Sequence, residues 1–324
     1  MRVCVLCSTT EGGPTPYVPI CDPDIGAFAP EHTFDIRFIH PGKAQEELGT
    51  LARGDVDVFL NMCDGAPDQA IAGIDVVEAL EQLGLPFTGA NSAFYAVTRE
   101  GMKQTCAALD VPTPAYGFAQ NLAEAEAIGR RLRFPLFVKH HDSYASIGLR
   151  PSSRVEDPGA LRAEAARLLD RFGRVLIEEF IDGDEVSAMV LEDPDAPDGL
   201  RVLRPIRVGL PPGESFIHYA LKDEERAALD WLPVQDAGLI ARIEAVVRPL
   251  FRGVHGRSYG RCDLRLGRDG RLFALEMNAN CAIFCIPGTP DHPSIGDAIL
   301  LSDPLGPGGF LRHILRNALR AAGG

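Results

Sequence analysis

Short apolar runs alternate with amphipathic stretches at the start of the chain. The runs have the length of buried strands and lie at residues 3–6, 34–39, 56–60 and 86–89. Between the third and the fourth run, residues 71–83 carry apolar side chains at helical spacing, and Gly84 follows as a stop. This alternation of strands and helices predicts an α/β layer with a mostly parallel sheet.

A second unit is expected to begin near Thr98, where apolar residues return at helical spacing. Asn121 and Glu124 have the pattern of a capping box, which predicts the start of a helix. Asp157 before Pro158 predicts the start of another helix, with the aspartate as its cap. The strands of this unit are expected at residues 136–139 and 175–177.

The rest of the chain predicts a third unit with strands, one long helix and a hairpin. Its first strands are expected at residues 186–191 and 200–208. Residues 209–235 are irregular and polar, as in loops that cover active sites. Asp236 then caps an amphipathic helix, and a short helix is expected at residues 310–319.

These units predict an α/β protein of several domains (α+β multidomain). The domain boundaries follow the changes of pattern, and the domains are expected at residues 1–95, 96–180 and 181–324.

The hairpin at residues 261–278 carries the most informative polar pattern. If its turn closes symmetrically, Asp263 lies opposite Ala274. One face is then polar and carries Arg261, Asp263, Glu276 and Asn278. The other face is apolar and carries Cys262, Leu264, Leu266, Phe273 and Leu275. Asp263 and Glu276 become diagonal neighbours, roughly 7–8 Å apart, and oxygen ligands at that distance can share hard cations.

Two other interpretations of the hairpin stay open. Its polar face could be solvated, with Arg261 paired to a carboxylate. A bulge in the turn would shift the register and change which residues face each other.

Other polar residues stand at strand ends. Lys139 precedes a loop of small residues, which suits a phosphate contact, although it could be an ordinary exposed lysine. His140 and His141 are adjacent, and adjacent strand residues point oppositely, which argues against a shared metal. Glu178 and Glu185 could hold an adenine amino group and a ribose hydroxyl, or could belong to an acidic linker.

Composition narrows the choice of partners. The 324 residues are 46% hydrophobic and 24% charged, as in soluble globular proteins of two or three domains. The net charge of -13 argues against nucleic acid as the main partner, because its backbone needs clustered cations. The sequence contains no apolar run of about 18 residues, so we expect no membrane span. These features argue against nucleic acid and a membrane as partners.

The eight cysteines do not form a dense disulfide framework. Cys4 and Cys262 lie in apolar strand-like runs, as reduced core cysteines do, so we expect a cytoplasmic protein. Cys4 and Cys7 have the spacing of metal ligands, and Cys281 and Cys285 are four apart. However, strand alternation places Cys4 and Cys7 on opposite faces, which disfavours a zinc site.

Several segments together resemble one family. They occur in order as "FLNMCDG", "ALEQLGLPFTGAN", "MKQTCAALDVPTP", "FPLFVK", "VLIEEFIDGDE" and "GRCDLRLGRDGRLFALEMNAN". The set is similar to the ATP-grasp ligases, specifically the D-alanine–D-alanine ligase family, over about residues 1 to 285. The resemblance implies an ATP-grasp fold with an N-terminal Rossmann-like pre-ATP-grasp domain.

The resemblance implies a nucleotide site. Lys139 and Arg99 would contact the phosphates of ATP, although the family usually has lysine at the second position. Lys222, in a segment similar to the family's mobile loop, would reach the γ-phosphate and take part in catalysis. Glu185 would bind the ribose. The adenine pocket would be lined by Glu178, Glu179, Phe180 and Ile181.

The resemblance also implies the chemistry. Two Mg²⁺ ions, for which Mn²⁺ can substitute, would be bound by Asp263, Glu276 and Asn278. Phosphoryl transfer from ATP would activate a carboxylate, an amine would attack the acyl phosphate, and Arg261 would stabilise the oxyanion. The products would be an amide, ADP and phosphate. Relatives of this type are often dimers, so a homodimer is expected.

The sequence departs from the family where substrates bind. Asp64 and Gly65 stand in place of histidine-glycine, and Ser143 stands in place of a glutamate. Residues 279–285 replace the proline-glycine and serine-leucine that hold the acceptor's carboxylate in the family. We therefore expect a ligase for another amino acid or a peptide.

Three alternatives remain at this point. The first is an ATP-grasp kinase that phosphorylates a small molecule, and the second is a catalytically silent ATP-binding regulator. The third is a dinucleotide-binding oxidoreductase, which the α/β start suggests but which lacks a G-x-G-x-x-G turn after the first strand.

Overall fold

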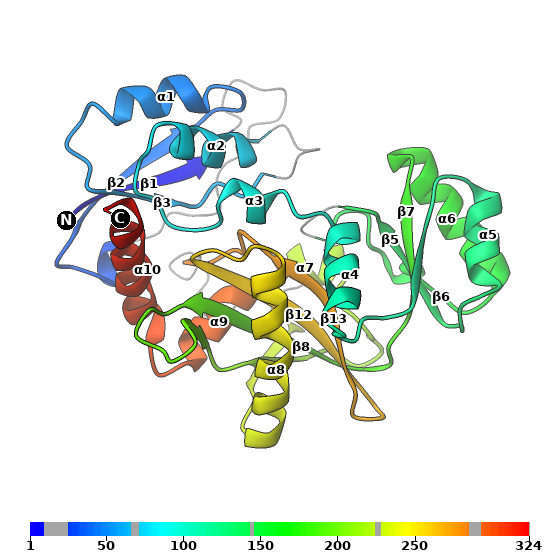
Figure 1. Ribbon diagram of the computed structural model, residues 1–324. Coiled ribbons are helices and arrows are strands. Elements are labelled where there is room, and N and C mark those ends of the chain that lie inside the picture. The colour runs from blue at the N-terminus through cyan, green and yellow to red at the C-terminus, as the bar shows by residue number, and fades with distance from the viewer. Residues whose placement is uncertain (10–24, 66–70, 143–145, 224–227, 285–292, 324) are drawn as a thin grey trace.

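The computed structural model describes residues 1–9, 25–65, 71–142, 146–223, 228–284 and 293–323, without the side chains of Lys222 and Asp223. These residues form three sheets with helices packed on them (Figure 1). The first sheet has the order β2-β1-β3, and all its strands are parallel. They are β1 (Arg2–Ser8), β2 (Thr33–Ile39) and β3 (Val58–Asn61).

Helices cover both faces of the first sheet. One face packs against α1 (Ala44–Leu51) and α2 (Ile74–Gln82), and Cys4 lies in that core. The other face packs against the C-terminal helix α10 (Gly306–Ala322), and Cys7 lies in that second core. The predicted parallel layer and the opposite orientation of the two cysteines are confirmed.

The second sheet forms a separate lobe, on the right in Figure 1. Its order is β4-β7-β5-β6. The strands are β4 (Tyr116–Ala119), β5 (Leu136–His140), β6 (Arg154–Val155) and β7 (Val175–Glu179). The helices α5 (Leu122–Gly129) and α6 (Pro158–Phe172) cover one face. The predicted caps are confirmed, because the side chains of Asn121 and Asp157 accept hydrogen bonds from the backbone N–H groups of Glu124 and Ala160.

The third sheet is the largest and has the order β11-β10-β8-β12-β13, with β9 also paired to β8. Its strands are β8 (Gly183–Glu192), β9 (Leu200–Val202), β10 (Ile206–Gly209), β11 (Asp230–Pro233), β12 (Tyr259–Gly267) and β13 (Leu272–Asn278). One face packs against α4 (Arg99–Ala108) and α8 (Ala237–Gly253), and α9 (Ile295–Ser302) contacts strands of this sheet from the opposite core. Shorter elements are η1 (Ile25–Ala27), α3 (Ser92–Tyr95), η2 (Pro151–Ser153) and α7 (Tyr219–Asp223).

Some element predictions are wrong in detail. Residues 200–208 form two strands rather than one, and Pro205, which has no N–H to donate to a ladder, lies between them. Residues 86–89 form only an isolated bridge between Phe87 and Phe59. The segment 209–235 is not irregular throughout, since it contains α7 and β11. The division into domains at residues 95/96 and 180/181 stays a prediction.

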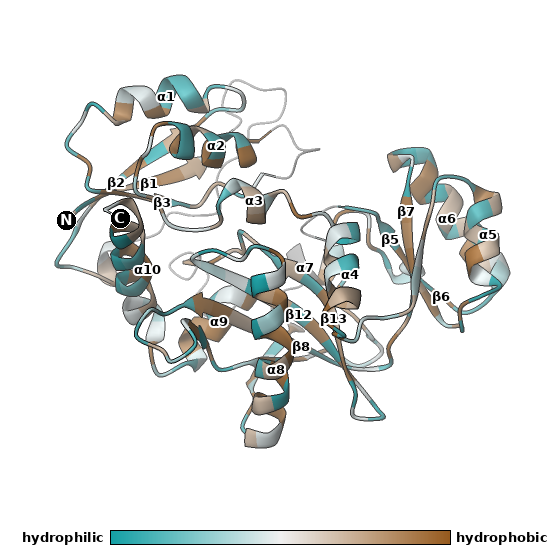
Figure 2. Cartoon of the chain, viewed as in Figure 1, coloured by the Kyte–Doolittle hydropathy of each residue, from teal (hydrophilic) through white to brown (hydrophobic). Residues whose placement is uncertain are grey.

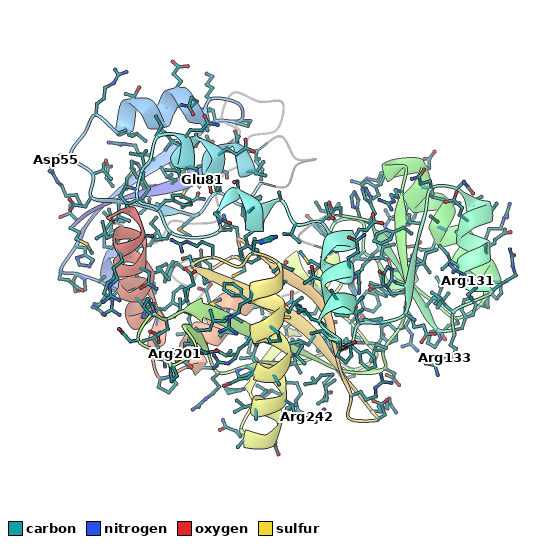
Figure 3. The ribbon with its side chains drawn as sticks, viewed as in Figure 1. Asp55, Glu81, Arg131, Arg133, Arg201 and Arg242 are labelled. Carbon is teal, nitrogen blue, oxygen red and sulfur yellow. The ribbon has the colours of Figure 1, made fainter. Side chains whose placement is uncertain are left out.

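The distribution of polarity follows this layered arrangement. Figure 2 shows apolar residues gathered on the strands and on the helix faces that cover them. Charged residues such as Asp55, Arg131 and Arg242 lie on the outside of the molecule (Figure 3). Within the part of the chain that the structure describes, no helix has both the length and the apolar character needed to span a bilayer.

Gly183 at the start of β8 lies in close backbone contact with the neighbouring strand β12. Gly183 has a φ of 153°, and a Cβ there would overlap the carbonyl oxygen of Leu266 on β12. We expect Gly183→Ala to lower the free energy of unfolding by about 2 kcal/mol or more, measured by urea denaturation. Gly49→Ala in α1 is the control, because nothing lies within 4 Å of its added methyl group. That change should be neutral or stabilise by up to about 1 kcal/mol. Equal effects at both positions would contradict this expectation.

Candidate active site

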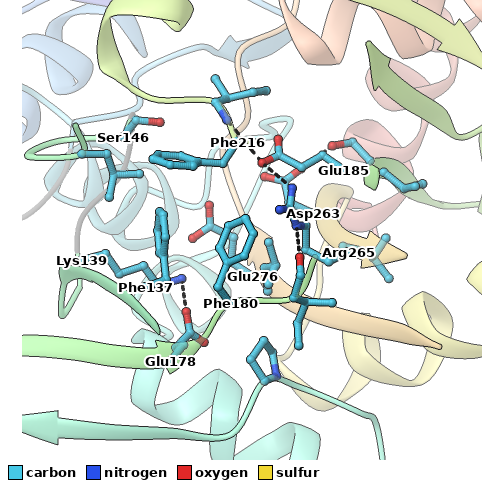
Figure 4. Close-up of a pocket in the computed structure, with 18 of the residues that line it drawn as sticks. Phe137, Lys139, Ser146, Glu178, Phe180, Glu185, Phe216, Asp263, Arg265 and Glu276 are labelled. Carbon is cyan, nitrogen blue, oxygen red and sulfur yellow. Dashed lines mark hydrogen bonds and ion pairs between the residues drawn. The ribbon is translucent and has the colours of Figure 1, made fainter. Parts of the chain in front are cut away.

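A pocket lies between the second and third sheets (Figure 4). It is lined by every predicted site residue whose side chain the structure describes, namely Arg99, Lys139, Glu178, Glu179, Phe180, Ile181, Glu185, Arg261, Asp263, Glu276 and Asn278. These residues come from α4, β5, β7, β8, β12 and β13 and from the connection after β7. Strand alternation explains the arrangement. Leu136 and Val138 of β5 face the core under α5 and α6, and Phe137 and Lys139 face the pocket.

The hairpin has a different register from the one predicted. Asp263 lies directly opposite Glu276, and Leu264 lies opposite Ala274, so Leu275 is the extra residue of a bulge in β13. The predicted diagonal relation and the pairing of Asp263 with Ala274 are therefore wrong. The predicted apolar face is wrong on the β13 side as well, since Leu272, Ala274 and Met277 face the core instead of Phe273 and Leu275.

The bulge brings the two carboxylates of the polar face closer together than predicted. Asp263 and Glu276 are direct cross-strand neighbours, and such side chains lie closer together than diagonal ones. Arg261 and Asn278 form the next pair of the same ladder.

Each of these carboxylates has a cationic partner. Arg261 donates to Asp263 through both Nε and Nη2, at 2.9 and 2.8 Å, and this matches the alternative interpretation of a paired arginine. Asp263 also accepts from Asn278 Nδ2 at 2.8 Å. Arg99 donates to Glu276 at 3.0 Å through Nε. Burial would raise the pKa of Glu276, but Arg99, Lys139 and Arg261 together lower it to about 2.

The residues fit a hard divalent cation. Carboxylate and amide oxygens are the ligands of Mg²⁺, which uses few protein groups and completes its shell with phosphate oxygens and water. Within the described residues no group of three or more His, Cys, Asp or Glu residues could hold a metal. A magnesium ion at this place would therefore use Asp263, Glu276 and the Asn278 amide, and would depend on a phosphate ligand.

A buried ion cluster stands at the other side of the pocket. The Glu178 carboxylate pairs with Lys139 at 2.6 Å and also with Lys103 of α4. Lys103 is 1% exposed and also contacts the Thr113 hydroxyl. Burial would raise the pKa of Glu178, but Lys103 and then Lys139 lower it to about 2. Burial lowers the pKa of Lys139, and the attraction of Glu178 opposes this shift.

The far end of the pocket is aromatic. Phe137 and Phe216 make an edge-to-face contact with ring centroids 4.8 Å apart, and Phe180 lies 6.1 Å from Phe137. Glu185 accepts from the Ile217 N–H and from Arg265. Burial raises the pKa of Glu185, while Arg265 opposes that shift. A flat apolar ring system with adjoining hydroxyls would suit this end.

Some predicted features lie elsewhere or cannot be placed. The rings of His140 and His141 stack, with centroids 4.6 Å apart, so the prediction that they point oppositely is wrong. The reason is that β5 ends at His140, and strand alternation does not extend to His141. Lys222 lies in α7, but its side chain, like Ser143 and Cys285, lies outside the described residues. Asp64 is exposed in the segment after β3.

The sequence interpretation missed two charged residues of the pocket region. Arg265 follows Arg261 and Asp263 at alternate positions of β12, so the same period-2 argument would have placed it on the polar face. Lys103 gave a weaker signal, since only its position one helical turn after Arg99 suggests a shared face.

Comparison with known proteins finds the same family by sequence model and by individual relatives. The family description "D-ala D-ala ligase C-terminus" matches residues 109–289. The D-alanine–D-alanine ligase of Ralstonia nicotianae is 33% identical over 267 residues, which cover 81% of this chain and 73% of that protein.

Solved structures share the fold at lower identity. D-alanine–D-alanine ligase from Bacillus anthracis complexed with ATP has a TM-score of 0.68 at 17% identity and covers 100% of this chain and 99% of that one. VanG D-Ala:D-Ser ligase from Enterococcus faecalis has a TM-score of 0.69 at 17% identity, with 98% and 99% covered.

Fold and site together define the class, which is an ATP-dependent ligase of the ATP-grasp type. Within this class, the chain belongs to the D-alanine–D-alanine ligase family. The predicted family resemblance and fold class are therefore confirmed.

The contact between Lys103 and Glu178 should contribute to stability. We expect Lys103→Met to lower the free energy of unfolding by about 2–3 kcal/mol, because Glu178 would keep only one of its two cations in a buried place. Urea denaturation followed by circular dichroism measures the change. Arg162→Met is the matched control, since Arg162 pairs with Glu126 on the exposed surface. It should cost less than about 1 kcal/mol. Equal losses in the two variants would contradict the prediction.

The same cluster predicts a pH dependence. The pKa of Glu178 is about 2 in the folded chain, below its ordinary value of 4.5. The unfolded chain therefore binds more protons between these values, and stability rises with pH through this range. We expect Glu178→Gln to be less stable than the unsubstituted protein above pH 4.5, by an amount on the order of 3 kcal/mol. The difference should shrink as the pH falls from 4.5 towards 2. Unfolding curves at several pH values measure it, and a constant difference down to pH 3 would refute the assignment.

Proposed function

We propose that the protein activates the carboxylate of a small molecule as an acyl phosphate and joins it to an amine, with release of ADP and phosphate. The observation that carries this proposal is the pocket itself. Arg99 and Lys139 line the same partly buried pocket as two neighbouring carboxylates, Asp263 and Glu276. Phosphoryl transfer needs such cations for the phosphates and such carboxylates for the metal.

The nucleotide would lie along the pocket. Its adenine would occupy the aromatic end next to Phe137 and Phe180, beside Glu178, Glu179 and Ile181. The ribose would reach Glu185. Lys139 and Arg99 would hold the phosphates, and Lys222 would contact the γ-phosphate.

Two divalent ions would be held by Asp263, Glu276 and Asn278. When bound, Mg²⁺ neutralises charge on the phosphate oxygens during transfer. Asp263 and Glu276 would orient these ions, and Ser187, which donates to Asp263 at 2.7 Å, would hold that carboxylate in place.

In the first step, an oxygen of the substrate carboxylate attacks the γ-phosphorus, and the bond to the bridging oxygen of ADP breaks. In the second step, the amine nitrogen attacks the acyl carbon, and phosphate leaves with the former carboxylate oxygen. Arg261 would donate hydrogen bonds to the oxyanion that develops in this second step, since its guanidinium is fixed beside Asp263 and stays protonated.

We infer that the acceptor differs from that of a D-alanine–D-alanine ligase and is another amino acid or a peptide. The support comes from the segment after Asn278. Asn280 donates to the carbonyl of Cys63 at 2.6 Å, and Ile283 and Phe284 are buried in the core. This segment and Asp64 depart from the family's substrate residues. The D-Ala:D-Ser ligase of similar fold illustrates that the fold serves more than one acceptor.

Assembly and compartment remain predictions. A homodimer is proposed from the family resemblance alone. A cytoplasmic location agrees with Cys4, Cys63, Cys106, Cys262 and Cys281, which are free and buried. We do not expect a nucleic-acid partner, because the net charge is -13.

The test is turnover with Mg²⁺-ATP and pooled D- and L-amino acids, with nucleotides, phosphate and product masses measured together. We expect ADP, free phosphate and a new amide mass. AMP with pyrophosphate would overturn the acyl phosphate. ADP with a stable phosphorylated product would indicate a kinase, and D-alanyl-D-alanine as the best product would overturn the substrate inference.

Two variants connect the reaction to the site. Glu276→Gln keeps the shape but removes the charge that would hold the metal, so we expect turnover to fall by about 100-fold or more. Glu244→Gln on α8 is the control, because Glu244 pairs with Arg248 on the helix surface, and turnover should be unchanged. A chelator should stop the reaction, and added Mg²⁺ or Mn²⁺ should restore it. Full activity of Glu276→Gln would be incompatible with the proposed metal site.

A further inference from the structure

One charged residue of the pocket has no role in the reaction proposed above. Arg265 lies on β12 with 3% of its surface exposed, and it lines the pocket. It is directly opposite Glu185 in the antiparallel pairing of β12 with β8. A guanidinium is rarely buried so fully unless its donors are used.

The guanidinium binds three separate segments around the pocket. Nε donates to the carbonyl of Ile181 at 3.0 Å, and Nη2 donates to the carbonyl of Ser215 at 2.8 Å. Nη1 donates to Glu185 Oε1 at 3.2 Å. The planar fork of an arginine can reach three acceptors in fixed directions, which a lysine cannot do.

The plane of the guanidinium is also fixed from the side. Its carbon lies 4.7 Å from the centroid of the Phe180 ring, which is within the range of a cation–π contact. Figure 4 shows Arg265 beside Glu185, with dashed lines for the hydrogen bonds between the residues drawn. Arg265 therefore has one orientation, and whatever it binds is oriented with it.

The consequence is clearest at Glu185. Every hydrogen bond that the described residues donate to this carboxylate ends on Oε1, from Arg265 and from the Ile217 N–H. These two donors fix the rotation of the carboxylate, and they leave Oε2 as the oxygen that a ligand in the pocket can use. The Ile217 donor belongs to the same segment as Ser215, so Arg265 holds both the carboxylate and the segment that contacts it.

We propose that Arg265 is a positioning residue that aims the Glu185 carboxylate at a ribose hydroxyl and thereby makes the site selective for ribonucleotides. This inference rests on the proposed function, because it requires that a nucleoside triphosphate binds in this pocket. It goes beyond that function by naming the residue that sets sugar selectivity.

A purely structural role predicts a different result. If Arg265 only joined the strands, its loss would weaken the binding of all nucleotides alike. If Arg265 orients Glu185, its loss should weaken only the binding of nucleotides that carry the ribose hydroxyl that donates to Glu185. The ratio of affinities for ATP and its deoxy analogues separates these two cases.

The experiment measures the dissociation constants of ATP, 2′-deoxyATP and 3′-deoxyATP by calorimetry with Mg²⁺. The unsubstituted protein should bind ATP more tightly than at least one deoxy analogue, by about ten-fold or more, since a hydrogen bond to a carboxylate is lost. In Arg265→Met, the ratio of the dissociation constant of that deoxy analogue to that of ATP should fall towards one. Arg207→Met is the matched control, because Arg207 pairs with Asp184 beside Glu185 but is exposed. It should keep the full ratio.

Two further variants complete the test. Glu185→Gln should lose the ratio by itself, and adding Arg265→Met to it should cause no further loss in the ratio, because both changes act on one hydrogen bond. Arg265→Lys keeps the charge without the fork, should also lose the ratio, and serves in place of Arg265→Met if that variant does not fold.

The failures are distinguishable. If the unsubstituted protein binds none of the three nucleotides, the proposed function is overturned, and this inference with it. If the protein binds ATP but Arg265→Met and Arg265→Lys keep the full ratio, only the role of Arg265 is overturned. An equal affinity of the unsubstituted protein for all three nucleotides would also overturn that role and leave the proposed function in place.

Discussion

The site depends on charges that neutralise one another in a buried place. The cations of the pocket region include Arg99, Lys103, Lys139, Arg261 and Arg265, and they pair with the carboxylates Glu178, Glu185, Asp263 and Glu276. Each group would be costly to bury alone, because desolvation of an isolated charge amounts to several kcal/mol. These groups neutralise each other instead. Two of the cations lie on α4, where Lys103 pairs with Glu178 of the second sheet and Arg99 pairs with Glu276 of the third sheet. The helix therefore connects the two sheets that form the pocket.

Under the proposed function, some of these pairs have to exchange partners. Arg99 pairs with Glu276, yet the first would hold a phosphate and the second a metal ion. A nucleotide and its metal arrive as anion and cation together, so each side of the pair gains a new partner of the same sign as the old one. The exchange leaves no charge unpaired. The pair of Lys103 with Glu178 is different, because Lys103 is buried, does not line the pocket and can keep Glu178 in place throughout.

Much of this arrangement could be predicted because it follows local rules. The caps at Asn121 and Asp157 depend only on side chains three residues from the N–H groups that they satisfy. The polar face of β12 follows from alternation, although Arg265 was overlooked. Register could not be predicted in the same way. The bulge places one extra residue, Leu275, in β13, and a symmetric turn is only the simplest of several closures of a hairpin. Lys103 stayed hidden for a similar reason, because its partner is seventy-five positions away in the chain.

Under the proposed function, the nucleotide and the acceptor would lie in two parts of the site that different interactions hold in place. Ion pairs and strand register fix the part where the nucleotide would bind. At the other half, Asn280 after β13 donates to the Cys63 carbonyl, and Asn61 Oδ1 accepts from the Cys63 N–H, so amides attach the end of β13 to the segment after β3. These bonds involve none of the charged groups that face the nucleotide. A change in the segment after Asn278 can therefore reshape the place of the acceptor while the ion pairs stay as they are. Under the proposed function, this independence would let the acceptor site change while the arginine, lysine and carboxylates of the pocket keep their places.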